Sequence, residues 1–248
     1  DDVIAALHCP NDGIADHTQT TQSFAQAAQR AGAQICEQTV VETVDIQGGQ
    51  IKAVITTQGE RISVGKAVIL LSNTHVPKLL QQHFNLTLPL WLMWPQVMLT
   101  DPIDPLPMRH LVGHAHRTLS IKPHFADESS VGQVMISGGW LGQWDASQNR
   151  GVTRPDQVAG NLAEAVAVYP DLIGIGVAEA DAGRPEMITV DDIPIIDTVS
   201  GAENLFYATG WSGHGWAIAP TVTRLLAEWI WSNQQPELLK PFSYQRFL

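Results

Sequence analysis

The segment around Gly210–Gly215 limits most strongly what this chain of 248 residues can fold into. Residues 204–209 (Asn-Leu-Phe-Tyr-Ala-Thr) predict a short strand, and the glycine-rich loop follows directly. Pro220 is expected at the start of a helix. The apolar positions of that helix are Val222, Leu225, Leu226, Trp229 and Ile230. A strand, a glycine loop and a helix in succession let a ligand approach the backbone and meet free N–H groups.

The loop differs from the best-known phosphate-binding motifs. It matches neither the G-x-G-x-x-G dinucleotide motif nor a P-loop, and neither motif occurs elsewhere in the chain. Spacing alone therefore leaves two interpretations open, a ligand-binding loop and a structural turn without a ligand.

The first third predicts a helix followed by strands. Asp16 or Thr18 can cap a helix that Gly32 ends. Val40 to Ile46 and Ile51 to Ile55 flank Gly48-Gly49, which indicates a hairpin. The continuous apolar run 67–71 is typical of a strand buried on both faces.

The middle of the chain predicts a different kind of layer. Between Pro89 and Asp145, short strands are expected at 96–100, 116–123 and 133–138, with a polar turn at 127–132. This pattern is typical of a mostly antiparallel sheet. A helix should begin at Pro155, with Val158, Leu162, Ala165 and Tyr169 on one face.

The fold class is thus mixed α/β (α+β), with part of an α/β ligand-binding domain and an antiparallel-sheet domain. A family resemblance described below implies that 1–88 form the first part of the ligand-binding domain and 183–248 its C-terminal part. Between them, 89–150 form the core of the antiparallel-sheet domain and 151–182 its helix and return strand.

Composition excludes several classes of protein. The net charge is −11, with no basic run, which argues against nucleic acid or an anionic membrane as a partner. No apolar run approaches the ~20 residues of a membrane span. Cys9 and Cys36 give no disulfide framework. We therefore expect idle or buried thiols in a reducing, cytoplasmic setting.

Two further groups of side chains carry candidate chemistry. Arg184 precedes a strand-like segment, and its planar guanidinium suits a carboxylate, with a surface ion pair as the alternative. His110, His114, His116 and His124 lie close in sequence. No carboxylate or cysteine completes a metal signature there, so pocket lining or exposure is favoured and no metal is expected.

Taken together, these segments resemble a known family. Residues 208–220 (Ala-Thr-Gly-Trp-Ser-Gly-His-Gly-Trp-Ala-Ile-Ala-Pro) closely resemble the C-terminal flavin loop of the D-amino-acid oxidase superfamily, which includes glycine oxidase and the sarcosine oxidase β subunit. Gly183-Arg184-Pro185, followed by 192–196 (Asp-Ile-Pro-Ile-Ile), is similar to another element of that family. The similarity extends over nearly all of the chain.

The resemblance implies FAD as cofactor and a small amine or amino acid as substrate, oxidised by hydride transfer to the flavin. It implies an FAD-binding domain with an antiparallel substrate domain. Arg184 and His214 are the implied catalytic residues, and Arg184, His116, Trp94 and Trp140 the implied substrate residues. The implied cofactor-binding residues are Val41, Ser72, Asn73, Gly210, Trp211, Ser212, Gly213, His214, Gly215 and Trp216.

The sequence departs from the family pattern in three respects, one of which is His17, where the family often has proline. Family members begin with a unit that carries G-x-G-x-x-G, and Asn73 stands where the family usually has glycine. We therefore expect an incomplete chain or subunit that needs an N-terminal dinucleotide-binding unit, supplied in some cases by a partner chain that could also accept electrons. The alternative is a non-catalytic relative that acts as an interaction or assembly subunit.

Overall fold

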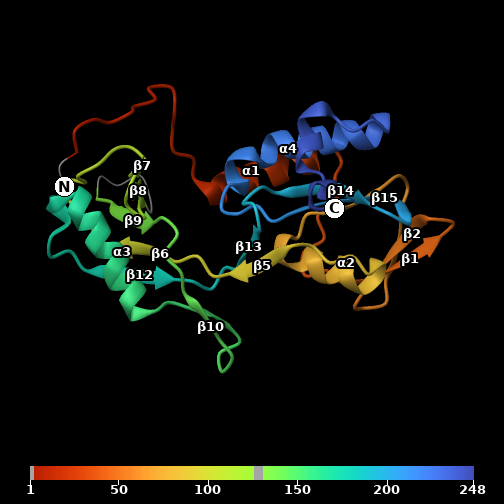
Figure 1. The fold of residues 1–248 in the computed structure, drawn as a ribbon, viewed down its shortest axis with the longest axis horizontal. Helices are drawn as coiled ribbons and strands as arrows, with labels where there is room; N and C mark the ends of the chain where they lie inside the picture. The colour runs from red at the N-terminus through yellow and green to blue at the C-terminus, as the bar shows by residue number, and fades with distance from the viewer. Residues whose placement is uncertain (1–2, 126–130) are drawn as a thin grey trace. The chain divides into compact units, whose positions relative to one another are not determined.

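A computed structural model describes residues 3–125 and 131–248. These residues divide into two compact units (Figure 1). Unit 1 comprises 1–35 and 94–185, and unit 2 comprises 36–93 and 186–248. The breaks after residues 93 and 185 fall near the expected boundaries, whereas the first 35 residues cluster with unit 1.

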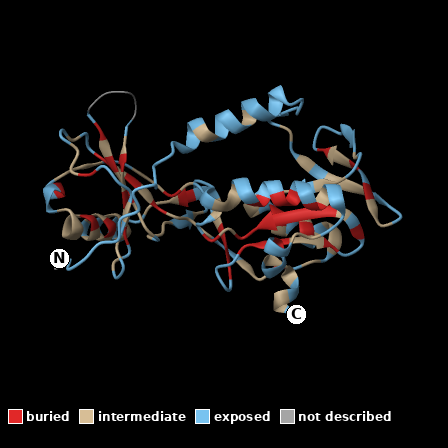
Figure 2. Ribbon diagram, turned by 90° about the horizontal axis from the view of Figure 1, so that it is seen from above, coloured by how far each residue is buried: buried red, intermediate tan, exposed pale blue. Residues whose placement is uncertain are grey.

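Unit 2 is built on strand β15 (Ala202–Thr209). It pairs antiparallel with β14 (Ile195–Val199) on one side and parallel with β4 (Val68–Leu70) on the other. Its alternate side chains enter two different hydrophobic clusters. Figure 2 shows this strand as the most deeply buried part of the sheet. The predicted strand at 204–209 is confirmed.

Smaller layers surround this sheet. The predicted hairpin around Gly48-Gly49 is confirmed as an antiparallel pair. The hairpin consists of β1 (Val41–Gln47) and β2 (Gln50–Thr56), and β3 (Arg61–Ser63) pairs with β2. Two further strands, β5 (Leu90–Met93) and β13 (Glu186–Thr189), pair with each other. The helical elements of unit 2 are η1 (Asn73–His75), α2 (Val76–Phe84), α4 (Gly215–Ser232), η3 (Glu237–Phe242) and η4 (Tyr244–Phe247).

The expectation for residues 67–71 is wrong in one respect. They form β4, but β4 lies at the edge of its sheet and is not buried on both faces. Ile69 is 40% exposed and Leu71 42% exposed. Within the described residues only β15 pairs with this strand, so one edge of β4 keeps unpaired backbone groups.

The expected start of the last helix is also wrong. Helix α4 begins at Gly215, and Pro220 lies inside it. The glycine loop turns into the helix five residues earlier than a proline at the first helical position would require. Proline at an interior position removes one backbone hydrogen bond from the helix, and Pro220 itself is exposed.

Unit 1 contains the predicted antiparallel sheet. Its five strands lie in the order β12 (Val177–Asp181), β6 (Val97–Thr100), β9 (Gln133–Ser137), β8 (Ser120–His124) and β7 (Val112–Gly113). Helix α3 (Pro155–Val168) begins at the predicted proline and packs on one face, with η2 (Pro170–Leu172) after it. Strands β10 (Gln143–Asp145) and β11 (Arg150–Val152) form a separate hairpin. The turn expected at 127–132 falls largely outside the described residues.

The N-terminal helix α1 (His17–Arg30) confirms the predicted helix. Asp16, rather than Thr18, caps it and accepts a hydrogen bond from the Gln19 N–H at 2.7 Å. No residue of α1 is buried, and Phe24 is 58% exposed. Its apolar face has therefore found no covering partner within the described part of the chain.

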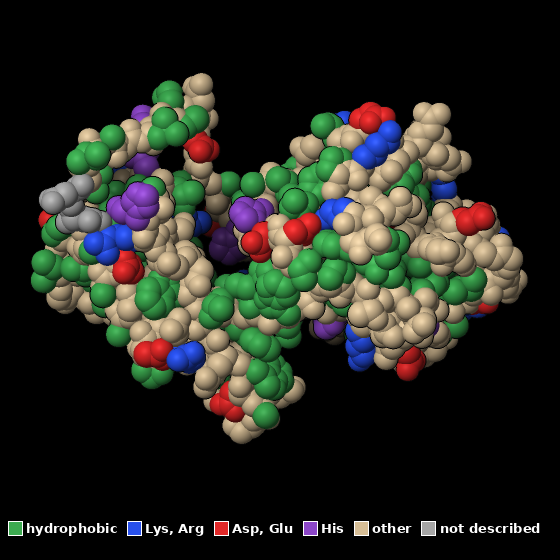
Figure 3. Space-filling model, viewed as in Figure 1, with side chains coloured by type: hydrophobic (Ala, Val, Ile, Leu, Met, Phe, Trp, Pro, Cys, Tyr) green, Lys and Arg blue, Asp and Glu red, His purple; other side chains and the backbone are tan. Residues whose placement is uncertain are grey.

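Two surface expectations concern charge and thiols. Figure 3 shows basic side chains dispersed singly among acidic ones on the face in view. Cys9 and Cys36 are both free and both exposed, so the alternative of buried thiols is wrong. Among the described residues, no helix has the length and apolarity needed to cross a membrane.

The C-terminus is held to unit 2 by Arg246. Its guanidinium donates to both oxygens of Asp191, at 2.8 and 3.2 Å, and to the carbonyls of Ile193, Phe242 and Ser243. These Arg246 bonds are the main reason why the pKa of the Asp191 carboxyl falls from 3.8 to about 2, against the opposing effect of desolvation.

We predict that Asp191→Asn lowers the free energy of unfolding by about 1–2 kcal/mol at pH 7, because a charge-assisted bond is lost. The folded-state pKa lies below the unfolded one, so this stabilisation is present above pH 4 or so and disappears as the pH falls toward 2. Urea denaturation between pH 7 and pH 2 measures the difference. The control is Asp171→Asn at an exposed carboxylate, and a wild-type advantage independent of pH would contradict the prediction.

Candidate functional site

The glycine loop of unit 2 has a backbone that few sequences can adopt. Gly210, Ser212 and Gly213 have φ angles of 71°, 50° and 79°. A Cβ atom on Gly210 would lie 2.5 Å from Thr189 Cγ2 and 2.7 Å from Leu90 Cδ2. A Cβ on Gly213 would meet no protein atom within 4 Å. Gly210 is thus required by packing, whereas Gly213 borders open space.

Hydrogen bonds from neighbouring segments fix the loop. The Gly210 N–H donates to Asn73 Oδ1 at 3.3 Å, and the Ser212 N–H donates to the Met187 carbonyl at 3.2 Å. The His214 N–H donates to the Trp211 carbonyl at 2.8 Å. The loop is therefore tied to β13 and to the turn after β4.

Three loop N–H groups remain without a partner. Those of Trp211, Gly213 and Gly215 meet no acceptor among the described residues. They lie at the N-terminal end of α4, an 18-residue helix whose dipole is positive there. The arrangement suits an electron-rich carbonyl or an anion.

Ser212 has a buried hydroxyl that serves the loop itself. It donates to the Gly210 carbonyl at 3.2 Å and accepts from the Thr189 N–H at 3.3 Å. His214 and Trp216 are exposed, and Trp211 packs against the cluster beneath α4. The loop thus directs different side chains inward and outward at successive positions.

Asn73 contacts the glycine loop, and Ser72 precedes it in the chain; their role beside a cofactor stays a prediction. Asn73 Nδ2 donates to Glu186 Oε1 at 2.6 Å, and the Thr209 hydroxyl donates to the Asn73 carbonyl at 2.9 Å. Sequence reasoning missed Glu186. Its position directly after Arg184-Pro185, at the start of β13, is the only signal that could have identified it.

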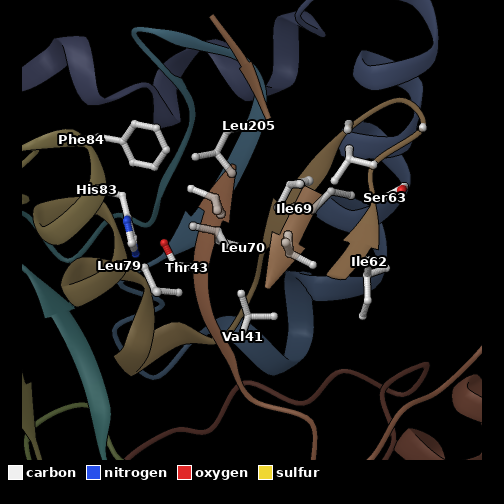
Figure 4. Close-up of a pocket in the computed structure, with 16 residues that line it drawn as sticks. Val41, Thr43, Ile62, Ser63, Ile69, Leu70, Leu79, His83, Phe84 and Leu205 are labelled. Atoms are coloured by element: carbon white, nitrogen blue, oxygen red, sulfur yellow. The ribbon is translucent and has the colours of Figure 1, made fainter. Parts of the chain in front are cut away.

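Val41 lines a different part of unit 2. It borders an apolar cavity of about 390 Å³ together with residues of β4 and α2, and no loop residue lines that cavity (Figure 4). His83 is the titratable side chain in its wall, and the buried Nε2 of His83 has no partner among the described residues. The structure therefore does not bring Val41 and the glycine loop into one pocket.

The remaining candidates belong to unit 1. Arg184 is exposed and makes no ion pair or hydrogen bond within the described chain. Trp94 contacts Trp144 with ring centroids 5.6 Å apart, and Gly151 lies beneath the Trp94 ring. Trp140 donates from Nε1 to the Thr118 carbonyl at 2.7 Å, and its ring packs on Gly160.

Two members of the histidine group contact each other through a side chain and the backbone. His114 Nδ1 accepts from the backbone N–H groups of His116 and Arg117, each at 3.1 Å. His116 itself is exposed. Among the described residues no three His, Cys, Asp or Glu side chains converge on one point.

Unit 2 thus has a sheet that ends in a glycine loop with unpaired N–H groups, and unit 1 has an antiparallel sheet of its own, so the fold is mixed α/β. Residues 1–229 match the model of the family described as FAD dependent oxidoreductase. The chain belongs to this family.

Individual proteins support the match. The chain is 27% identical over 253 residues to the "Bifunctional protein ThiO/ThiG" of Synechocystis sp., covering 100% of the chain and 35% of that protein. It is 25% identical over 249 residues to "Sarcosine oxidase subunit beta" of Rhodobacter capsulatus, covering 99% of the chain and 56% of that protein. The chain thus spans about half or less of the length of these curated relatives.

Solved structures show the same fold. L-proline dehydrogenase from P. horikoshii superposes with a TM-score of 0.84 at 24% identity, over 96% of this chain and 61% of that one. Glycine oxidase from Geobacillus kaustophilus gives a TM-score of 0.69 at 22% identity, over 92% of this chain and 57% of that one.

We predict that Gly210→Ala destabilises the protein more than Gly213→Ala does. Both substitutions force alanine into a positive φ, which costs about 1 kcal/mol or more. The Gly210 variant must also displace Thr189 and Leu90, which adds about 1–3 kcal/mol. Urea denaturation of the two variants tests this, and equal losses would contradict the packing role of Gly210.

Proposed function

We propose that this chain forms part of a flavoenzyme that oxidises an amine or amino acid, with FAD seated against Gly210–Gly215. The observation that carries the proposal is the set of three unpaired N–H groups on Trp211, Gly213 and Gly215. Open space above Gly213 leaves room for a ring to approach the backbone. These features fit the electron-rich edge of an isoalloxazine ring.

The chain's own residues would bind and orient the reactants. FAD, when bound, supplies the hydride acceptor. The loop N–H groups would stabilise negative charge, and the exposed, unpaired Arg184 would hold a substrate carboxylate. His214 is exposed at the N-cap of α4, and we propose it as a second catalytic residue. Trp94, Trp140 and His116 are proposed to shape the substrate pocket.

Hydride transfer from a carbon that bears an amine needs a neutral amine and a C–H bond aimed at the acceptor. Positioning can supply much of that rate without a dedicated base. The proposal therefore assigns no general base.

We also propose that activity requires a dinucleotide-binding unit N-terminal to these residues or supplied by a partner chain. Parallel strands are normally buried between neighbours, yet β4 has only one, and Ile69 and Leu71 are exposed beside it. A parallel strand that carries the G-x-G-x-x-G motif and pairs with the free edge of β4 would complete this sheet.

A second candidate is a non-catalytic subunit that keeps the fold for assembly. The missing G-x-G-x-x-G motif and the asparagine at position 73, where the family usually has glycine, favour it. A cytoplasmic location and a partner chain that accepts electrons remain proposals, supported by the two free thiols and by the word "subunit" in the name of one relative.

An absorption spectrum of the purified protein separates the two candidates. The enzyme proposal predicts the visible absorption bands of a bound flavin, which bleach anaerobically with an amine or amino-acid substrate. A protein that assembles with a dinucleotide-binding unit and still holds no flavin would support the assembly subunit instead.

We predict that Arg184→Ala raises KM for a carboxylate-bearing substrate by about 10- to 100-fold, since a charge-assisted bond is worth about 1.5–3 kcal/mol. Arg154→Ala is the matched control, because Arg154 is also an exposed arginine of unit 1 but pairs with Asp156. Steady-state kinetics measures both variants. An unchanged KM in Arg184→Ala would remove this residue from the carboxylate role.

A further inference from the structure

Asn73 lies at the turn after β4 in a conformation that few side chains tolerate. Its φ of 41° is in the left-handed region, where asparagine is the best accepted residue after glycine. Glycine would fit the same backbone without strain. The presence of a side chain here therefore calls for an explanation from its contacts.

Both ends of the Asn73 amide make hydrogen bonds. Nδ2 donates to Glu186 Oε1 at 2.6 Å. Oδ1 accepts from the Gly210 N–H and from the Thr209 hydroxyl, each at 3.3 Å. A glycine would make none of these contacts, so the side chain links the β4 turn to the start of the loop.

Glu186 extends the link to a third segment. Its Oε1 also accepts from the Met187 N–H at 2.8 Å, which fixes the carboxylate at the first residue of β13. Farther along β13, the Met187 carbonyl accepts from the Ser212 N–H, and the Thr189 N–H donates to the Ser212 hydroxyl. The loop is thus held at Gly210 through Asn73 and at Ser212 through β13.

We propose that Asn73 and Glu186 form a positioning pair that fixes the entrance of the glycine loop and so the direction of its unpaired N–H groups. Because Asn73 occupies the Gly210 N–H, ligand binding falls to Trp211, Gly213 and Gly215. The assignment of FAD as that ligand rests on the proposed function, whereas the pairing itself does not.

The chemistry of the pair sets a strict requirement. Residue 73 must donate to a carboxylate and accept from an N–H at the same time, which an amide does. Aspartate at 73 keeps the acceptor but places a second carboxylate against Glu186. With glutamine at 186, the side-chain amide of residue 186 would donate and the carboxylate of residue 73 would accept, so the hydrogen bond is restored in the opposite direction.

The test is amide hydrogen exchange of Gly210, measured by NMR on the purified chain without added ligand. Asn73→Gly should speed exchange at Gly210 by about tenfold, because it removes the acceptor of this N–H. Asn73→Asp should have a similar effect, because repulsion between its carboxylate and that of Glu186 turns the acceptor oxygen away from Gly210. The double variant Asn73→Asp/Glu186→Gln should return the rate to within about threefold of wild type.

Asn85→Gly is the matched control. Asn85 also has a left-handed backbone, with a φ of 51°, at the end of α2 in the same unit, but it does not contact the loop. It should leave Gly210 exchange unchanged. If the Gly210 amide exchanges at the wild-type rate in Asn73→Gly, the proposed pair is overturned. The same holds if the double variant exchanges at Gly210 as fast as Asn73→Asp, or if the double variant fails to fold.

Flavin affinity provides the second readout. In protein that binds FAD, the dissociation constant for FAD should rise in Asn73→Asp and return toward the wild-type value in the double variant. The urea midpoints of the variants should not follow the same order as their affinities for FAD. Loss of affinity that tracks the urea midpoint alone would reduce the pair to a structural contact. If wild type and every variant fail to bind FAD in the presence of a dinucleotide-binding unit, the proposed function is contradicted, and the exchange result alone decides the pairing.

Discussion

The pairing of β15 is the interaction on which unit 2 depends. Leu205 and Tyr207 enter one hydrophobic cluster, and Phe206 and Ala208 enter another, so a single strand joins both cores. The same strand ends at Gly210, where the approach of Thr189 and Leu90 leaves no space for a side chain. Core packing thereby determines where the loop begins, and α4 begins five residues later.

Rigidity at the base of the loop has a chemical consequence. An N–H group stabilises developing charge well only if it already points in the right direction, since reorientation would cost free energy. Here Gly210 and Ser212 are tied to the protein, while the three N–H groups of Trp211, Gly213 and Gly215 are left for a ligand. This separation of structural and available donors is the strongest physical argument for a cofactor site.

Most helices and strands could be predicted because the residues that begin or end them lie within or next to the element itself. Asp16 and Gly32 bound a helix, Gly48-Gly49 join two strands, and Pro155 begins α3. The apolar run around Ile69 was misjudged because burial depends on neighbours that local sequence does not specify, and β4 pairs on one side only. The predicted helix start at Pro220 was wrong because the glycine loop already enters α4 at Gly215, and this outweighs the preference of proline for the first helical position.

The functional roles of the site residues stay predictions. The glycine loop was identified from its residue types, whereas Asn73 was identified only through the family resemblance. Glu186 was missed because a single acidic residue after a proline carries no pattern, and its role arises from a contact with a residue 113 positions away. The substrate residues Arg184, His116, Trp94 and Trp140 stay predictions.

The most direct test of the account is an FAD titration followed by NMR of protein labelled with ¹⁵N at glycine and tryptophan, in the presence of a dinucleotide-binding unit. The account predicts the largest amide shifts at Trp211, Gly213 and Gly215, with a smaller shift at Gly210, whose N–H is already bonded to Asn73. Saturating FAD that leaves these three amides unmoved would contradict the assignment of the glycine loop as the flavin site.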